Sequence, residues 1–479
     1  MDLQFVQKSL DHHLRIGLGG IHHGGVSLVV MHRGSATLVT VPPLGPSSDM
    51  PPIGGDTLFH LCSCSKAFLA LTFSSLVAEG LISWDDRIDR LIPEMALPDP
   101  EARALCTFRD LGCMRTGLSR DGIAEWGIKQ DLPKDQRVAR SRHMKMMSSF
   151  RQRFTYSNLA YIAIGLAIER LTARSLADVQ RELLFQPLGI TGVWSGCTQF
   201  GSPENLCRPV VSLGGTAVRV EDLTGANSEG SARIHLSAHA AIPWLSFLLE
   251  IASGNSRSKA TKSFAEVFAP QTKIPAADVR WSPEGRPCSY GMGFFISQFH
   301  GYRLLHHGGA GRGWRVQCLV LPEADTALLL MASAESARID GLAFDLLELL
   351  LGSGREGETW SQRIETETRR RAEEVRLQMA RQFPETGELC RPVVSGYYEN
   401  PLTGRVKVTD EGGRPRMEFE DAPIFNSDLI ETSSGTLIMD INEPALKQQP
   451  LDPLFRLRSA HDEAGAIDTT YFGRLYRCS

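Results

Sequence analysis

One short run, HLCSCSKAFLALTF, places two serines and two cysteines directly ahead of Lys66. The mostly apolar residues after the lysine predict a helix, on which positions i and i+3 or i+4 share a face whereas i+1 and i+2 do not. Ser65 and Cys64 should therefore point away from Lys66. Ser63, three residues before, and Cys62, four residues before, can both reach the lysine side chain.

The spacing Ser63-x-x-Lys66 suits serine chemistry, since a lysine amine next to a serine hydroxyl can take its proton. The start of a helix also supplies unpaired N–H groups and positive potential, which stabilise a developing oxyanion. Spacing alone leaves Cys62 open as a second nucleophile. A capping serine followed by a surface lysine would also explain a single pair of this kind.

Two further groups of polar residues accompany this pair. The segment FRQRFTYSNLAYIAIG carries Tyr156 and Asn158 just before a strongly apolar helix. The segment YRLLHHGGAGRGW carries His306, Gly308 and Gly309 just before a predicted strand. The chain thus contains S-x-x-K, then Y-x-N, then H-x-G, in that order.

This order of motifs resembles the penicillin-recognising serine hydrolases, which include class C β-lactamases, D-aminopeptidases and related carboxylesterases and transesterases. Three other segments, LVAEGLISWDDRIDRLIPE, LGCMRTGL and FQPLGITGVW, each resemble a family motif. The resemblance extends from about Gly24 to Ser353. It implies a β-lactamase/transpeptidase-like fold and an acyl-enzyme mechanism.

The resemblance also implies catalytic roles. Ser63 would be the acylated nucleophile, and Lys66 would act as its base. Tyr156 would share the proton transfer to the leaving group, and Asn158 would hold Lys66 and the substrate carbonyl. Because these companions belong to a serine mechanism, the resemblance selects Ser63 over Cys62.

The H-x-G segment would border the substrate. The backbone N–H groups of Ser63 and Gly309 would form the oxyanion hole, with Gly308 beside them. His306 would border the leaving-group or carboxylate side, where many members have the lysine of K-T-G. A histidine is not a fixed cation at neutral pH, so this site should not favour anionic β-lactams.

Two segments depart from the family pattern. Cys113 or Met114 stands where the family has a histidine before its T-G-L segment. The family's A-G-G-L-x-S-T-x-x-D stretch, which borders the site, is matched only faintly by NSEGSARIHLSAHA, residues 227–240. The substrate-facing wall is therefore where we expect this chain to differ most.

The elements that would position these residues predict an α+β fold. Residues 24–41 and 314–333 each have the pattern of two strands around a polar turn. Between and after them lie four helical runs, KAFLALTFSSLVAEG, NLAYIAIGLAIERLTARS, AIPWLSFLLEIASG and GLAFDLLELLLGSG. We expect one antiparallel sheet built from both ends of a domain, flanked by helices and with a helical region inserted.

The composition changes after this region, which predicts three parts. Residues 1–355 would be the β-lactamase-like catalytic domain. Residues 356–390 are strongly charged and predict a linking helix, with i,i+4 pairs such as Glu367–Arg371. Residues 391–479 contain short β-like runs between turns, which indicate a small β-barrel resembling the lipocalin-like domain of some family members.

Bulk properties exclude several classes. The net charge of -4 argues against a general nucleic-acid binder. The richest basic stretch, RVARSRHMK at 137–145, favours a solvated face or loop over a phosphate or anion patch. No apolar leader or span of ~20 residues is present, so we expect no membrane association and a cytoplasmic location. The ten cysteines and the paired histidines (12, 13, 22 and 23) lack ligand spacing, so we expect neither metal nor other cofactor.

We therefore expect a serine hydrolase or acyltransferase that acts on a small ester, lactone or amide, with a place in secondary metabolism. A D-amino-acid peptidase or a β-lactamase is the alternative within enzymes. A catalytically idle structural or filament-forming member is the alternative outside them. The partner would be a small-molecule substrate, and the sequence leaves a homo-oligomer open.

Overall fold

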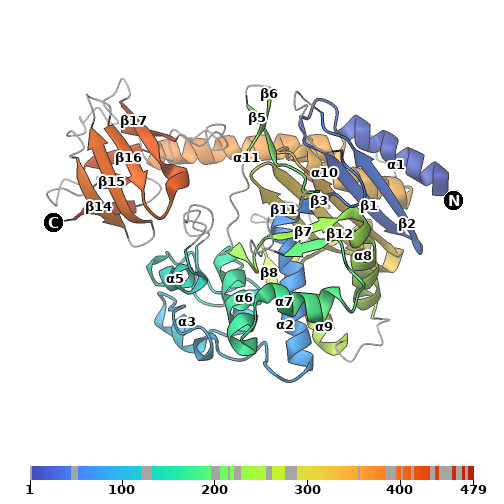
Figure 1. The fold of residues 1–479 in the computed structure, drawn as a ribbon, viewed down its shortest axis with the longest axis horizontal. Coiled ribbons are helices and arrows are strands. Elements are labelled where there is room, and N and C mark those ends of the chain that lie inside the picture. The colour runs from blue at the N-terminus through green and yellow to red at the C-terminus, as the bar shows by residue number, and fades with distance from the viewer. Residues whose placement is uncertain are drawn as a thin grey trace.

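A computed structural model gives the fold of the chain (Figure 1). The residues that it describes are 3–44, 52–119, 132–195, 205–213, 216–220, 228–254, 261–275, 288–353, 357–382, 395–400, 403–410, 415–431, 437–441, 456–459, 467–469 and 473–478.

An antiparallel sheet of eight strands lies at the centre of the region up to residue 353, in the order β2-β1-β13-β12-β11-β10-β9-β8 (Figure 1). Its strands are β1 Val26–His32, β2 Ser35–Val41, β8 Thr272–Ile274, β9 Cys288–Tyr290, β10 Phe295–Phe299, β11 Tyr302–Gly311, β12 Trp314–Leu321 and β13 Thr326–Ala332. The two predicted hairpins are β1–β2 and β12–β13. An antiparallel sheet with helices is therefore confirmed.

The two ends of this region meet in the sheet. Strand β1 pairs with β13 over its whole length, from Val26 opposite Ala332 to His32 opposite Thr326. Between β1 and β2 the chain turns through Arg33 and Gly34, both with positive φ, as in the tight turns that fit the twist of a hairpin. Hydrogen bonds between β1 and β13 thus close the region around the helices inserted between them.

Helices cover both faces of the sheet. Helices α1 (Leu3–Gly17), α10 (Arg338–Leu351) and α11 (Trp360–Gln382) share one apolar cluster with one face, through side chains such as Leu14 and Phe344. Helix α8 (Ala238–Ala252) contacts β1 and β13 from the other side. Sequence analysis named the helices at α8, α10 and α11 but not α1.

The inserted region is mostly helical and contains the second large apolar cluster. Its remaining helices are α2 Ser65–Ala78, α3 Pro100–Leu105, α4 Phe108–Gly112, α5 Lys134–Ala139, α6 Asn158–Thr172, α7 Leu176–Gln180 and α9 Thr261–Val267. Its short strands are β3 Leu58–His60, β4 Val193–Ser195, β5 Val210–Leu213, β6 Thr216–Arg219 and β7 Ile234–Ser237. Helix α2 is buried along nearly its whole length, which explains its almost unbroken apolar sequence.

Helix α11 leads from this region towards the C-terminal strands (Figure 1). It has 23 residues and is held partly by ion pairs, including the predicted Glu367–Arg371 contact of 2.5 Å. Its charges make it unlike a membrane span. Across the ranges given above, the chain has no helix that is both long and apolar enough to cross a bilayer.

The C-terminal strands are β14 Gly396–Asn400, β15 Gly404–Asp410, β16 Pro415–Phe419, β17 Ser427–Glu431, β18 Leu437–Ile441, β19 Arg456–Ser459, β20 Ile467–Thr469 and β21 Gly473–Arg477. Each pairs antiparallel with the next, and β14 also pairs with β21. Alternate side chains of β14–β16, such as Tyr398, Val406 and Met417, are buried on one side. Arg140 of the helical region donates to Asp421 in this part of the chain at 2.6 Å.

The contact between α10 and α11 gives a stability prediction. A Cβ on Gly341 would lie 2.4 Å from the Trp360 carbonyl oxygen and from the Ser361 Cα, so alanine must push the helices apart. We expect Gly341→Ala to lower the free energy of unfolding by about 1–3 kcal/mol, as overpacking does. Gly54, which is exposed with nothing within 4 Å of an added Cβ, is the control.

Denaturant titration of both variants measures the difference. Gly54→Ala should stay within about 0.5 kcal/mol of the wild type, as surface substitutions do. Equal stabilities for the two variants would contradict close packing of α10 on α11.

Candidate active site

Ser63 lies in a strained turn directly before helix α2. Strand β3 ends at His60, a 3₁₀ turn spans Cys62–Cys64, and α2 begins at Ser65. Cys62 has a φ of +48°, a left-handed conformation that costs energy for a residue with a side chain. The turn places Ser63 at the helix start, where backbone N–H groups are unpaired.

Lys66 is the side chain around which the site is built. It is fully buried on α2, yet its amine contacts three oxygen atoms. Nζ lies 3.1 Å from Ser63 Oγ, 2.6 Å from Asn158 Oδ1 and 2.9 Å from the carbonyl oxygen of Ser231. These oxygens come from three segments that are distant in the sequence.

The three contacts orient the amine towards the serine. The carbonyl oxygens of Asn158 and Ser231 can only accept hydrogen bonds, so they take two protons from Nζ in either charge state. In the neutral amine the lone pair then faces Ser63 Oγ and can accept its proton.

Tyr156 and Asn158 lie at the start of helix α6. Ser157 caps this helix, since its Oγ accepts from the Ala160 N–H at 3.3 Å. The cap turns the chain so that the Tyr156 ring centre lies 5.0 Å from Lys66 Nζ. The structure thus brings together Ser63, Lys66, Tyr156 and Asn158, the four residues that the sequence motifs indicated.

The H-x-G segment lies within strand β11 rather than ahead of a strand. Strand β10 pairs with β11 only as far as His306, so the following residues up to Gly311 extend beyond it. The turn that carries Ser63 packs against this end of the strand. A Cβ on Gly309 would lie 2.5 Å from the Leu61 carbonyl oxygen and 3.1 Å from the Cys62 Cβ, so close packing requires glycine at 309.

The structure gives His306 a different place from the one expected. Side chains alternate between the faces of a strand, and His306 lies on the face opposite to Gly309. Its ring stacks on Phe295 at 5.4 Å and lies 6.4 Å from Phe344 of helix α10. Gly308 is on the same side, where an added Cβ would meet the Gln317 side chain.

His307 takes the place expected for His306. Its ring lies 6.2 Å from that of Tyr156, and its Nε2 lies 3.3 Å from the Tyr290 hydroxyl. Nδ1 lies 2.7 Å from the Gly308 carbonyl oxygen, which can only accept. Nδ1 therefore carries the proton, and Nε2 accepts from Tyr290.

Both neighbouring histidines are neutral. Burial lowers the pKa of His306 to about 4. Burial, followed by the nearby charge of Lys66, lowers the pKa of His307 to about 3. No positive charge is therefore expected from either imidazole at neutral pH.

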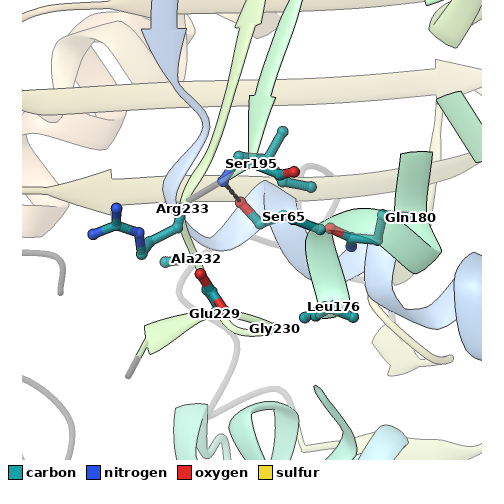
Figure 2. A pocket seen from close by; sticks show the side chains of 10 residues that line it. Ser65, Leu176, Gln180, Ser195, Glu229, Gly230, Ala232 and Arg233 are labelled. Atoms are coloured by element: carbon teal, nitrogen blue, oxygen red, sulfur yellow. Dashed lines mark hydrogen bonds between the residues drawn. The ribbon is translucent and has the colours of Figure 1, made fainter. Parts of the chain in front are cut away.

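Ser65 and Cys64 play structural roles. Ser65 Oγ accepts from the Ile234 N–H at 3.1 Å, and Figure 2 shows this serine at a small pocket lined also by Leu176 and Gln180. Ser63 and Lys66 do not line that pocket. Burial raises the pKa of the Cys64 thiol well above its usual range, and this thiol donates to the His307 carbonyl oxygen at 3.1 Å.

Sequence reasoning missed Ser231, which acts through its main chain. It lies in the faintly matched stretch 227–240, and polar contacts support the start of that stretch. Lys134 bonds Glu229 at 2.6 Å, and Arg137 donates to Ser228 at 3.0 Å.

The basic stretch 137–145 was expected to form a solvated face. Arg137 is only 2% exposed, so this expectation is wrong at that residue.

The residues described contain no group of three or more histidine, cysteine, aspartate or glutamate side chains that could hold a metal ion. The histidine pair at 22 and 23 lies outside the site. Burial lowers the pKa of His23 to about 4, so this ring is neutral at pH 7.

Comparisons with known proteins identify the family of this chain. The sequence profile of the Beta-lactamase family matches residues 10–350, and the chain belongs to this family. It is 25% identical over 290 residues to unguisins hydrolase ungD′ from Aspergillus campestris, covering 58% of this chain and 53% of that protein. It is 24% identical over 316 residues to a D-aminopeptidase from Brucella anthropi, covering 63% and 54%.

The chain spans about half the length of these curated relatives. A solved structure, the octameric penicillin-binding protein homologue from Pyrococcus abyssi, matches with a TM-score of 0.62 at 17% identity over the whole of both chains. This likeness supports the fold. The site described above lies within the residues that the family profile matches.

The positions of the two histidines predict different effects. His307→Phe removes the hydrogen bond to Tyr290 beside Tyr156, so we expect reaction of Ser63 with a fluorophosphonate to slow about ten- to hundredfold, as misplacement of reacting groups does. His306→Phe, on the other face of β11, should react at the wild-type rate. Time courses of adduct formation, quenched at intervals, measure the rate of each variant. Slower reaction of the His306 variant alone would contradict the placement of His307 beside Tyr156.

The neutral buried His306 also predicts acid sensitivity. Its pKa is about 4 in the folded protein and near 6.5 when unfolded, so the unfolded chain binds a proton first as the pH falls. The contribution of neutral His306 to the free energy of unfolding is present above pH 6.5 and is lost as the pH falls from 6.5 to about 4. Between pH 7 and 5 the wild type should lose about 2 kcal/mol more unfolding free energy than His306→Phe. Denaturant titrations at the two pH values measure this, and parallel losses would contradict it.

Proposed function

We propose that the protein is an acyl-enzyme serine hydrolase or acyltransferase that acts on small uncharged esters, lactones or amides. The observation that carries the proposal is the set of contacts at Lys66 Nζ, in which two carbonyl oxygens direct the amine at Ser63 Oγ. A surface lysine behind a capping serine would have no such set.

In the acylation step, the neutral Lys66 amine takes the proton of Ser63 as Oγ attacks the substrate carbonyl carbon. The carbonyl π electrons move to oxygen, and the N–H groups of Ser63 and Gly309 would stabilise the resulting oxyanion. One such donor typically contributes about 3–4 kcal/mol to the transition state. Asn158 keeps Lys66 in place and contacts the substrate.

Collapse of the oxyanion breaks the bond to the leaving group. Tyr156 would pass a proton to that group and recover one from Lys66, which leaves the acyl group on Ser63 and a neutral amine. Water then attacks the acyl carbonyl by the same route in reverse order, releasing the acid. An alcohol or amine in place of water would give acyl transfer.

The surroundings of His307 favour an uncharged substrate. His307 replaces His306 in the role assigned to the H-x-G histidine, and it supplies a neutral ring where many family members have a lysine. Partly exposed Phe154 packs on Tyr290 at 5.3 Å and Phe295 at 5.9 Å beside it. A carboxylate on the substrate would lose water here without gaining an ion pair.

The relatives support hydrolysis, since one is named a hydrolase and others D-aminopeptidases. A D-amino-acid peptidase is therefore the second candidate, ahead of a β-lactamase, because the neutral His307 gives no cation for a β-lactam carboxylate. Esterase or transesterase activity in secondary metabolism and a cytoplasmic location remain part of the proposal. The contacts of Lys66 oppose a catalytically idle structural role.

We also propose the three-part division at residues 1–355, 356–390 and 391–479. Pairing of β14 with β21 supports a small lipocalin-like barrel in the last part. The Arg140–Asp421 contact supports docking of that part on the catalytic region. The penicillin-binding protein homologue from Pyrococcus abyssi is octameric, which makes the oligomeric state of this chain worth measuring.

A substrate panel tests the proposal. Matched pairs of p-nitrophenyl esters, lactones and D-amino amides, each with and without a carboxylate, are assayed with wild type and Ser63→Ala. We expect turnover of at least one neutral class, a preference of about tenfold or more over the carboxylate partner (~1.4 kcal/mol), and no turnover by Ser63→Ala.

Turnover of D-amino amides with none of the esters would replace the esterase proposal by the peptidase. Equal turnover by the folded Ser63→Ala variant would contradict the nucleophile. Faster turnover of the carboxylate partners would contradict the neutral site.

A further inference from the structure

His60 is a fully buried histidine that lies on β3, three residues before the nucleophile. Its Nε2 lies 3.1 Å from the backbone nitrogen of Arg233, and its Nδ1 lies 3.4 Å from Cys62 Sγ. It stacks on His235 with ring centres 4.5 Å apart, and the Trp314 ring lies 6.1 Å away in a T-shaped arrangement. The ring thus connects the nucleophile turn to the start of β7.

The hydrogen bonds fix the protonation of this ring. A backbone N–H can only donate, so Nε2 of His60 must carry the lone pair and accept from Arg233. Nδ1 then carries the proton and faces Cys62 Sγ. A protonated ring would set N–H against N–H at Arg233, so this arrangement requires the neutral imidazole.

The backbone N–H of Arg233 lies in an irregular segment, where His60 supplies its acceptor. The φ of Arg233 is +82°, and Gly230 has a φ of +95°, so residues 230–233 have an irregular backbone before β7 begins at Ile234. Two residues before Arg233, the carbonyl oxygen of Ser231 accepts from Lys66 Nζ. A bond at Arg233 therefore bears on the position of an oxygen that orients the catalytic amine.

We propose that His60 is a positioning residue that holds the Ser231 carbonyl oxygen against Lys66 through the Arg233 N–H. This inference rests on the proposed function, since it concerns the same amine. The hydrogen bonds of His60 described above go to Arg233 and Cys62, so it would act on the amine through the main chain. The acceptor at Nε2 is the part that matters, because it is the atom that bonds the Arg233 N–H. The contact with Cys62 is secondary, so Cys62→Ala should leave acylation at Ser63 intact.

Loss of the acceptor has a distinct consequence for the base. A carbonyl oxygen that accepts from an ammonium group favours its charged form, so displacing Ser231 favours the neutral amine at lower pH. The titratable groups that face Lys66 are Tyr156, Tyr161, His307 and Cys64, and the substitutions at residue 60 replace none of them. The acid limb of the acylation profile should therefore move to lower pH while its plateau falls.

The test uses the rate of fluorophosphonate adduct formation, followed by intact mass as a function of pH. In His60→Gln the side-chain amide can reach the Nε2 position and accept from Arg233, whereas in His60→Asn it reaches only the Nδ1 position. His60→Phe keeps the ring stacking and removes the acceptor. His306→Phe is the matched control, since it replaces another buried histidine that lies on the far face of β11.

We expect His60→Phe and His60→Asn to acylate at least about tenfold more slowly than wild type, equivalent to about 1.4 kcal/mol in the barrier, with the acid limb moved to lower pH. The acylation rate of His60→Gln should stay within about threefold of the wild-type rate (~0.7 kcal/mol). The rate of His306→Phe should equal that of the wild type. Circular dichroism establishes that each variant is folded. If His60→Phe does not fold, the comparison of the acylation rates of His60→Gln and His60→Asn tests the inference.

Acylation of folded His60→Phe at the wild-type rate would overturn the inference, as would equal rates for the glutamine and asparagine variants. A slower rate with an unmoved acid limb would make His60 merely structural and would also overturn it. Failure of the wild type itself to form an adduct would instead contradict the proposed function. The two failures are thus distinguishable.

Discussion

The buried amine of Lys66 is the constraint on which the rest of the site depends. A buried amine needs partners, and here they come from the nucleophile turn, from the start of helix α6 and from the segment before β7. Because two of the partners are carbonyl oxygens, the remaining direction of Nζ is fixed towards Ser63. The fold can be understood as the arrangement that brings these three segments to one nitrogen atom.

The close approach of β11 is the second constraint. The strand extends past β10 and packs against the turn that holds Ser63, which leaves no room for a side chain at Gly309. The left-handed turn at Cys62 packs directly against this glycine. At this contact the backbone N–H groups of Gly309 and Ser63 would form the proposed oxyanion hole.

Helical spacing predicted only that Ser63 or Cys62 could reach Lys66. The resemblance to the penicillin-recognising serine hydrolases selected Ser63 and added Tyr156 and Asn158. Sequence analysis assigned the H-x-G role to His306 rather than His307, because a strand boundary set too late hid the alternation of faces. Glycines at 309 and 311, both on the face of His307, were the available indication.

Other features have no sequence signature. Ser231 acts through its carbonyl oxygen, which every residue possesses, and its place depends on an irregular segment. His60 lies in a strand of three residues, too short for a periodic pattern. Of the fold, the two hairpins and the four helical runs followed from apolar periodicity, whereas α1 lacks a strongly apolar sequence and was missed. Strand β17, Ser427–Glu431, was missed because its SDLIE sequence has few β-branched residues.

The central claim is that Ser63 becomes acylated with Lys66 as its base. The most direct measurement is peptide mapping by mass spectrometry after reaction of the wild type with a fluorophosphonate, beside Lys66→Ala under the same conditions. The account predicts one adduct, on the oxygen of Ser63, and little or none in the lysine variant. An adduct on Cys62 or Ser65, or none at all on the folded wild type, would contradict it.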